Sequence, residues 1–293
     1  MPEEAPESLL ALVDRVNDVS PLPGIVAQMM DVCNDPAAGA GNVAGVIGRD
    51  VALAARVVRT ANSAYYAVGR EITDIPGAVV RLGMSAIRNI VVGMNLAKLY
   101  RGPVDAETGF SRGELWKHSV AVSLLSDMIA RRSKLPATRQ LAGEAFLVGL
   151  LHDIGVVLED EHARDIYAQT PWSVRAEDET LSKAERRLMG FDHQALGAAV
   201  LEKWQFPEVI RQAVGAHHRP ASSAHNPLIQ VVALAEILAA DARLGYCDIP
   251  RAADAVLEGR LRSLNLSRYE AQKISQETCE KLPDALEIFA GSC

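Results

Sequence analysis

Five of the seven histidines in this chain lie in sequence contexts that suit a shared metal site. One lies in Leu-Trp-Lys-His-Ser, one in Val-Gly-Leu-Leu-His-Asp-Ile-Gly and one after Gly-Phe-Asp, and the last two are adjacent. They are His118, His152, His193, His217 and His218. Neutral imidazole is a good ligand for zinc and iron. The remaining two, His162 and His225, lie in polar stretches, and we expect both at the surface.

Two acidic residues stand inside apolar runs and raise the question of what compensates their charge. Asp153 follows His152 among leucines and isoleucine, and Glu236 interrupts the apolar stretch 228–240. An ionised carboxylate is costly to bury unless a cation or several donors compensate it. A divalent ion with imidazoles as further ligands would compensate both carboxylates at once. We therefore predict a site for iron, manganese, zinc or magnesium, whose candidate ligands are His118, His152, Asp153, His193, His217, His218 and Glu236.

The residue types by themselves leave a second interpretation open. Buried histidine and aspartate side chains also cross-link helices through hydrogen bonds without any metal. The two interpretations differ in their consequences: a metal site loses its ion when a ligand is removed, whereas a polar network loses thermal stability and does not respond to a chelator.

The elements that position these residues are predicted to be helices. Aromatic residues make up only 5% of the chain, whereas alanine, leucine and valine are abundant, and this balance favours packed helices over sheets. Helix-start signals support this, namely Ser111 with Glu114, Ser182 with Glu185, Ser267 with Glu270, and Asn226-Pro227. We predict an all-α protein with helices near 7–18, 111–132, 139–158, 174–189, 192–204, 206–217, 227–244, 249–262 and 267–290.

Composition and charge exclude several other classes of protein. The net charge of −7 provides no general attraction for nucleic acid, so we expect no nucleic-acid partner. The four cysteines form no CxxC pair, which argues against a disulfide framework or a cysteine zinc site. The first residues are acidic where a signal peptide is basic, and no apolar run approaches the length of a membrane span. We therefore expect a cytoplasmic protein with no membrane partner.

The order of the candidate ligands resembles that of the HD superfamily of metal-dependent phosphohydrolases. Further motifs make the resemblance specific to the HDOD family, a name that stands for HD-related output domain. These motifs are Leu22-Pro23, Ala-Asn-Ser-Ala-Tyr-Tyr at 61–66, the stretch Ile75 to Arg88, Leu-Leu-His-Asp-Ile-Gly at 150–155 and Gly-Phe-Asp-His at 190–193. The resemblance covers about residues 18–220. Within it, we expect Asn62 and Ser63 to tie a helix end to the following loop.

The resemblance implies an all-helical HDOD fold in which an N-terminal lobe packs on an HD-like lobe. By this resemblance we expect an N-terminal helix at 1–19, the N-terminal lobe at 20–105, the HD-like lobe at 106–225, and C-terminal helices at 226–293 that complete or flank it. Carried over by position, His118 is the first ligand and His152 with Asp153 is the doublet. The further histidines of two-metal relatives match His193 and His217 or His218, and Glu236 stands where those relatives have aspartate.

Two departures from the family pattern argue against catalysis. Val156 stands where many HD phosphodiesterases have a lysine, which would supply a cation for a phosphate oxygen. The Gly-Tyr-Pro element of relatives that hydrolyse cyclic di-GMP is also absent. We therefore expect a bacterial signal-transduction output module that binds a signalling protein or a small nucleotide, with a divalent metal site and little or no hydrolysis. The alternative is a metal-dependent phosphohydrolase acting on a nucleotide or phosphoester, in which Asp153 acts with the bound metal.

Overall fold

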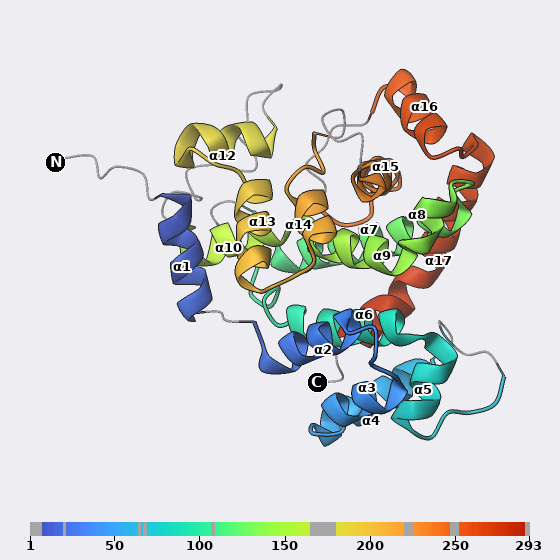
Figure 1. Ribbon diagram of the computed structural model, residues 1–293. Helices are drawn as coiled ribbons and strands as arrows, with labels where there is room; N and C mark the ends of the chain where they lie inside the picture. Colours follow the sequence, from blue (N-terminus) through green and yellow to red (C-terminus); the bar gives the residue numbers. More distant parts are fainter. Residues whose placement is uncertain are drawn as a thin grey trace. The chain divides into compact units, whose positions relative to one another are not determined.

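The described part of the chain folds into helices joined by turns and loops (Figure 1). The computed structural model describes residues 8–19, 22–63, 66, 69–106, 109–164, 180–219, 226–246 and 252–290. Every regular element within these residues is a helix, which confirms the all-α prediction. The chain divides into two compact units, one formed by residues 1–21 and 100–275 and the other by residues 22–99 and 276–293.

The first unit contains every candidate ligand. Its helices are α1 (Leu9–Val19), α7 (Arg112–Arg132), α8 (Pro136–Gln140), α9 (Ala142–Leu151), α10 (Ile154–His162), α12 (Leu181–Met189), α13 (His193–Lys203), α14 (Glu208–Val214), α15 (Pro227–Asp241), α16 (Asp254–Ser263) and the first part of α17 (Arg268–Ala290). At its centre, α7 packs against α9 and α15, and α13 packs against α10 and α14. Helices α9 and α15 are apolar on nearly all sides, as expected for helices buried by neighbours.

Local sequence signals explain where the central helices begin and how closely they pack. Ser111 accepts a hydrogen bond from the backbone N–H of Glu114 at 3.2 Å, as predicted for the start of α7. Asn226 caps α15 by accepting from the N–H of Leu228 at 3.0 Å. At Gly149, a Cβ would lie 2.6 Å from the carbonyl oxygen of Val122, so only glycine lets α9 approach α7 this closely.

One predicted helix is wrong and the difference matters for the site. We expected a single helix over 139–158, but α9 ends at Leu151 and α10 begins at Ile154, with His152 and Asp153 in the turn between them. Hydrophobic periodicity cannot detect this break, because apolar residues continue on both sides of it. The ends of other predicted helices, at 7, 174–179 and 249–251, lie outside the described residues.

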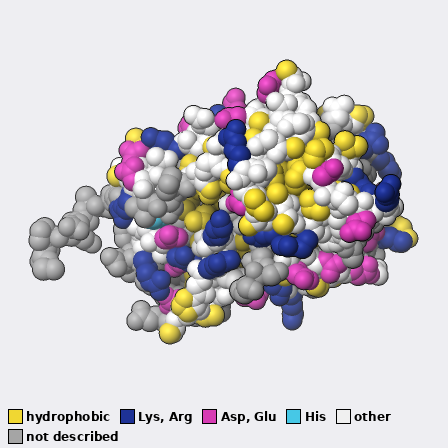
Figure 2. Space-filling view, turned by 90° about the horizontal axis from the view of Figure 1, so that it is seen from below, with side chains coloured by type: hydrophobic (Ala, Val, Ile, Leu, Met, Phe, Trp, Pro, Cys, Tyr) yellow, Lys and Arg dark blue, Asp and Glu magenta, His cyan; other side chains and the backbone are white. Residues whose placement is uncertain are grey.

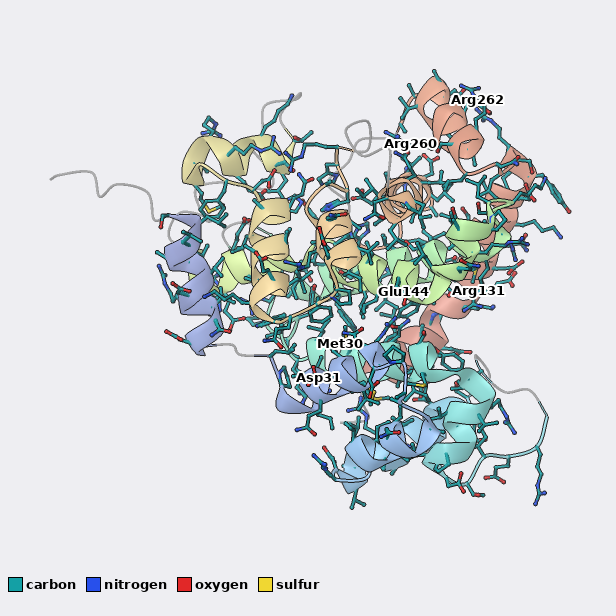
Figure 3. The ribbon with its side chains drawn as sticks, viewed as in Figure 1. Met30, Asp31, Arg131, Glu144, Arg260 and Arg262 are labelled. Carbon is teal, nitrogen blue, oxygen red and sulfur yellow. The ribbon has the colours of Figure 1, made fainter. Side chains whose placement is uncertain are left out.

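Helix α16 is anchored to α15 by one of its arginines. Arg260 points from α16 towards α15, where its Nη1 donates to Oε1 of Gln230 at 2.9 Å, whereas Arg262 points away and is exposed (Figure 3). The capping box predicted for α17 is confirmed, since the Ser267 N–H donates to Glu270 Oε2 at 2.7 Å and the Glu270 N–H donates to Ser267 Oγ at 3.2 Å.

The second unit consists of α2 (Gly24–Asn34), α3 (Ala40–Ile47), α4 (Val51–Ala61), α5 (Ile75–Leu82), α6 (Met84–Leu96) and the end of α17. Helix α2 is amphipathic, with Met30 buried and the neighbouring Asp31 exposed (Figure 3). Asn62 bonds to both backbone groups of Ile72, at 2.7 and 2.8 Å, which confirms the predicted tie to the next loop for Asn62. Ser63 does not make this tie, because its Oγ donates back to the carbonyl oxygen of Thr60 at 2.7 Å. No single helix of the described residues meets the length and hydropathy of a membrane span; α5 and α6 meet them only as a pair bent by 114°.

Candidate metal centre

The seven predicted ligands converge in the first unit from five separate places in the chain. His118 lies on α7 and Glu236 on α15, while His152 and Asp153 occupy the α9–α10 turn. His193 is the first residue of α13, and His217 and His218 lie in the turn after α14. All are buried except for His218, whose side chain is 17% exposed. Only a trace of histidine colour is visible on the face drawn in Figure 2.

Asp153 lies at the centre of the cluster, and each of its carboxylate oxygens faces two imidazoles. The Oδ1 atom lies 3.6 Å from Nε2 of His193 and 3.5 Å from Nε2 of His217. The Oδ2 atom lies 3.1 Å from Nε2 of His152 and 3.9 Å from Nε2 of His118. The turn between α9 and α10 therefore places one carboxylate between two pairs of histidines.

The geometry defines two overlapping sets of ligand atoms. One set comprises Asp153, His193, His217 and His218, and the other comprises His118, His152 and Asp153; within each set the ligand atoms lie within 4.8 Å of one another. Glu236 lies between the sets, with Oε1 3.9 Å from Nε2 of His152 and Oε2 3.6 Å from Nδ1 of His218. Asp153 is the residue that both sets share.

Three of the histidines are held in one tautomer by acceptors behind them. Nδ1 of His152 lies 2.8 Å from the carbonyl oxygen of Gly149, and Nδ1 of His217 lies 2.7 Å from that of Val214. A carbonyl oxygen only accepts, so each Nδ1 carries a proton, and in the neutral imidazole each Nε2 presents a lone pair to the cluster. These Nε2 atoms, and that of His193, are buried without a hydrogen-bond partner among the described residues.

The electrostatics of the cluster are those of several imidazoles around one carboxylate. Burial and the neighbouring His152 lower the pKa of His118 to about 4, although Asp153 acts in the opposite direction. Burial, with His217 and His193, also holds the pKa of His218 well below its usual value. The pKa of Asp153 is held well below its ordinary value because the surrounding histidines outweigh its burial. Among the described residues, no lysine or arginine forms an ion pair with Asp153 or Glu236.

Sequence analysis missed one residue of the site, Glu185 on α12. We predicted that Ser182 and Glu185 form a capping box, and this is wrong: α12 is capped at Thr180, and Ser182 lies inside the helix. Oε2 of Glu185 instead accepts hydrogen bonds from Nδ1 of His193 at 2.7 Å and from its backbone N–H at 2.9 Å. A usable signal existed, because Glu185 stands four residues after buried Leu181, on the apolar stripe of α12.

That hydrogen bond sets the properties of His193. Burial lowers its pKa, but the charge of Glu185 and the bond to it outweigh burial and raise the pKa to about 9. Gln194, the next residue, is also buried, and its Oε1 accepts from the backbone N–H of His218 at 3.3 Å. The start of α13 therefore supplies His193 and, through Gln194, also holds the backbone of His218.

Two residues with other predicted roles are also placed by the structure. Val156 is buried, so the position occupied by lysine in many phosphodiesterases presents no cation here. His162 is half-buried at the end of α10 and lies apart from the metal-ligand sets, whereas His225 lies outside the described residues. The structure therefore places no cation at position 156.

The donor set suits a divalent ion on an observation internal to this structure. Five imidazoles and the Asp153 carboxylate converge, and the Nε2 atoms of His152, His193 and His217 are buried with no hydrogen-bond partner among the described residues. Buried polar atoms are normally satisfied, so these nitrogens gathered around one carboxylate suit the binding of a cation. Imidazole nitrogen with carboxylate oxygen is a common ligand combination for zinc, iron and manganese.

Comparison with known proteins agrees with the helical fold. The model of the HDOD domain family matches residues 19–220. An HDOD domain protein of unknown function from Geobacter sulfurreducens is 27% identical, with a TM-score of 0.75 over 96% of this chain and 98% of the other. A candidate phosphohydrolase from Shewanella amazonensis is 25% identical, with a TM-score of 0.72 over 95% and 96%.

A curated relative from Treponema pallidum, itself uncharacterised, is 25% identical over 247 residues. The match covers 82% of this chain and 46% of the relative, so this chain spans about half of that relative's length.

Proposed function

This chain belongs to the HDOD family, and on that premise we propose that it is a signalling output module whose histidine cluster binds divalent metal and hydrolyses little or no phosphoester. The observation that carries the metal site is the set of buried Nε2 atoms that face Asp153 and have no hydrogen-bond partner among the described residues. We assign one ion to His118, His152 and Asp153, and a second to Asp153, His193, His217 and His218, with Glu236 within reach of either.

The residues of the cluster are better suited to binding a metal ion than to stabilising the transition state of phosphoester hydrolysis. Gly149, Val214 and Glu185 orient three imidazoles from behind, which raises their strength as ligands. A divalent ion in such a site supplies Lewis-acid activation of a phosphate group. Val156 contributes no charge, and a phosphoryl transition state normally needs a cationic side chain beside the metal. This imbalance supports binding with weak turnover.

A specific observation favours the second candidate, a metal-dependent phosphohydrolase. All the ligand positions of the two-metal pattern are filled, and their atoms lie close enough together for two ions. The Shewanella relative is also named as a candidate phosphohydrolase. For that function, Asp153 would orient both ions, and the more exposed His218 would lie on the side that a substrate approaches.

Metal content is the decisive measurement for the proposed function. We would quantify iron, manganese, zinc and magnesium by elemental mass spectrometry in the wild type, His152→Ala and Asp153→Ala, with His162→Ala as a control histidine outside the cluster. We expect metal in the wild type and in His162→Ala, and none in Asp153→Ala. A wild type that stays empty after incubation with these ions would establish a metal-free polar network instead.

Turnover separates the two metal-binding candidates. The loaded protein would be incubated with nucleoside mono-, di- and triphosphates, cyclic dinucleotides and a chromogenic phosphodiester, with loaded Asp153→Ala as the blank. We expect no release of phosphate or of the chromogenic product above the level of that blank. A rate that requires Asp153 would establish the phosphohydrolase.

Thermal shifts with the same nucleotides test the small-nucleotide partner, because a ligand that binds only the folded state raises the Tm.

A further inference from the structure

The short helix α1 lies against the two helices whose starts build one side of the metal centre. It packs on α10 and α13 (Figure 1). Its apolar side is buried, since Leu12, Val13 and Val16 are 1%, 2% and 0% exposed, whereas Leu10 on the other side is 72% exposed. An isolated helix of 11 residues is marginal in water, so α1 depends on this packing for its helical structure.

Two polar contacts place α1 at the far ends of those helices. Nη1 of Arg15 donates to the carbonyl oxygen of His162, the last residue of α10, at 2.6 Å. Nζ of Lys203, the last residue of α13, lies 3.0 Å from Oδ1 of Asp14. An exposed ion pair adds little stability, so the buried apolar side chains supply most of the attachment. The two contacts fix its position, which is across the C-terminal ends of α10 and α13.

The opposite ends of the same two helices carry candidate metal ligands. Asp153 immediately precedes α10, and His193 is the first residue of α13. The two starts are in contact at Gly155 and the backbone of His193. Nε2 of His193 lies 3.6 Å from Oδ1 of Asp153. Helices α10 and α13 therefore run side by side, with metal ligands at one end of the pair and α1 at the other.

We propose that α1 is a regulatory strap whose docking is coupled to metal binding by Asp153 and His193. An ion bound by these two residues ties the starts of α10 and α13 together, and docked α1 ties their ends. Each attachment restricts the same relative movement of the two helices, so the second to form loses less conformational entropy. The coupling is reciprocal: the ion favours docked α1, and undocking of α1 weakens the ion by the same factor.

This inference rests on the proposed metal site and concerns its regulation. An output module needs a part of its surface that changes when its ligand binds. Docking of α1 supplies such a change, because undocking uncovers Leu12, Val13 and Val16 together with the surfaces of α10 and α13 that they cover.

The first test measures the docking of α1 directly, by hydrogen–deuterium exchange and mass spectrometry of peptides that contain this helix. The metal-free wild type and the wild type loaded with Zn²⁺ would be compared at one pH. We expect loading to slow the exchange of α1 amides by at least about fivefold, the lower end of usual coupling between sites. Peptides from α16, in the same unit, are the control and should change less than α1. Equal slowing in α1 and α16 would indicate general stabilisation and overturn the proposal.

The second test measures metal affinity after α1 is released. Val16→Asp places a charge at a fully buried position, whereas Leu10→Asp adds the same charge to the exposed side of the helix. Each metal-free protein would be titrated with Co²⁺, followed by its visible absorption bands. We expect Val16→Asp to weaken the ion at His193 by the factor that exchange gives for the coupling, and Leu10→Asp to bind as the wild type does.

The outcomes distinguish a strap from a purely structural helix. A structural helix would lower the Tm in Val16→Asp and leave Co²⁺ affinity unchanged, which would overturn the proposal. Equal losses of affinity in Val16→Asp and Leu10→Asp would overturn it as well, because charge alone would explain them. If Val16→Asp does not fold, Arg15→Ala removes the bond to the His162 carbonyl and should give a smaller loss of affinity.

Failure of the coupling and failure of the proposed function give different results. A wild type that binds Zn²⁺ with no change in the exchange of α1 would overturn the coupling and leave the metal site standing. A wild type that binds neither Zn²⁺ nor Co²⁺ would overturn the proposed function, and the coupling with it.

Discussion

The backbone of His193 lies directly against Gly155, so closely that a Cβ on Gly155 would overlap the carbonyl carbon and oxygen of His193. Gly155 lies in the first turn of α10, two residues after Asp153, and His193 begins α13. This contact is what brings the start of α13 to the Asp153 carboxylate. The glycine of the His-Asp-Ile-Gly stretch therefore has a steric role in building the site, with no chemical one.

Substitution of Gly155 with alanine is predicted to open the site. The added methyl group meets backbone, which cannot rotate away, so α10 and α13 must separate. We expect a loss of about 1–3 kcal/mol in the free energy of unfolding, together with a weakened ion at His193 and His217. Chemical denaturation and Co²⁺ titration measure the two effects. Gly259→Ala on α16 is the control, because nothing lies within 4 Å of its Cβ position. This variant should keep both the wild-type stability and the wild-type affinity for the ion.

The shared position of Asp153 predicts a pattern of metal stoichiometry. His118→Ala should lose only the ion of its own set, and His218→Ala only the other, because each histidine belongs to one set. Asp153→Ala should lose both. Elemental mass spectrometry after loading with excess Zn²⁺ and desalting measures the ratios. Loss of all metal in His118→Ala would instead indicate one ion held by the whole cluster.

Metal removal is predicted to destabilise the wild type and leave Asp153→Asn unchanged. An ion that binds only the folded state adds about 2.7 kcal/mol when its free concentration is a hundredfold above its Kd. The Tm measured with and without chelator should therefore differ in the wild type and agree in the variant. A Tm that falls equally in both proteins on chelation would mean that the ion binds elsewhere.

The buried acid Glu159 is predicted to make stability fall as the pH rises. Its folded-state pKa lies well above the ordinary 4.5, so its stabilising contribution is complete below pH 4.5. Above this pH the unfolded chain releases the proton and the folded protein keeps it, so stability declines by about 1.4 kcal/mol per pH unit until the folded-state pKa is passed. Urea unfolding of the metal-free wild type and Glu159→Gln should show the variant gaining relative stability over that range.

The control for this pH dependence is an acid whose pKa moves the other way. Hydrogen bonds from the backbone and side chain of Ser267 lower the pKa of Glu270. The stability that Glu270 contributes to the folded protein is present above pH 4.5, and it is lost as the pH falls through the folded-state pKa of Glu270. Glu270→Gln should therefore differ from the wild type in its pH profile only in acid. Parallel profiles for the wild type and Glu159→Gln above pH 4.5 would show that Glu159 is ionised in the folded protein.

Gly245 is predicted to be necessary for the His118 side of the cluster. Its φ of +79° favours glycine, and a Cβ there would lie 2.5 Å from the backbone nitrogen of His118 and 2.6 Å from the carbonyl oxygen of Glu114. Gly245→Ala should displace this segment and break the hydrogen bond from the Tyr246 N–H to Glu114, which is 3.0 Å long. We expect the free energy of unfolding to fall by about 1–3 kcal/mol. The variant should also lose the ion at His118 and retain the ion at His193.

Gly109→Ala separates backbone strain from steric contact in that experiment. Gly109 also has a positive φ, of +71°, but nothing lies within 4 Å of its Cβ position. Gly109→Ala should lower the free energy of unfolding by about 1–2 kcal/mol through backbone strain alone, and both ions should stay bound. Loss of the ion at His118 in both variants would show that general destabilisation, and not displacement of His118, removes it.

The helical class and the candidate ligands could be predicted from the sequence because their signals are local. Apolar spacing, the caps at Ser111 and Asn226, and acids within apolar runs are all visible within a few neighbouring residues. The seven ligands were named on that basis and on the resemblance to the HDOD family, and the structure brings all seven into one cluster. Their role as metal ligands stays a prediction until metal is measured.

Only the tertiary structure decided how these residues are used. The break at His152 and Asp153 is invisible to periodicity, yet it turns the Asp153 carboxylate between two pairs of imidazoles. Glu185 carried the local signal of a helix cap, but packing of α12 near α13 gave its carboxylate a stronger partner in His193. Burial and the charge of Glu185, both products of folding, raise the pKa of Glu159 well above its ordinary value. Sequence patterns report what each residue prefers among its neighbours along the chain, whereas burial and partners across the fold set its charge and its role.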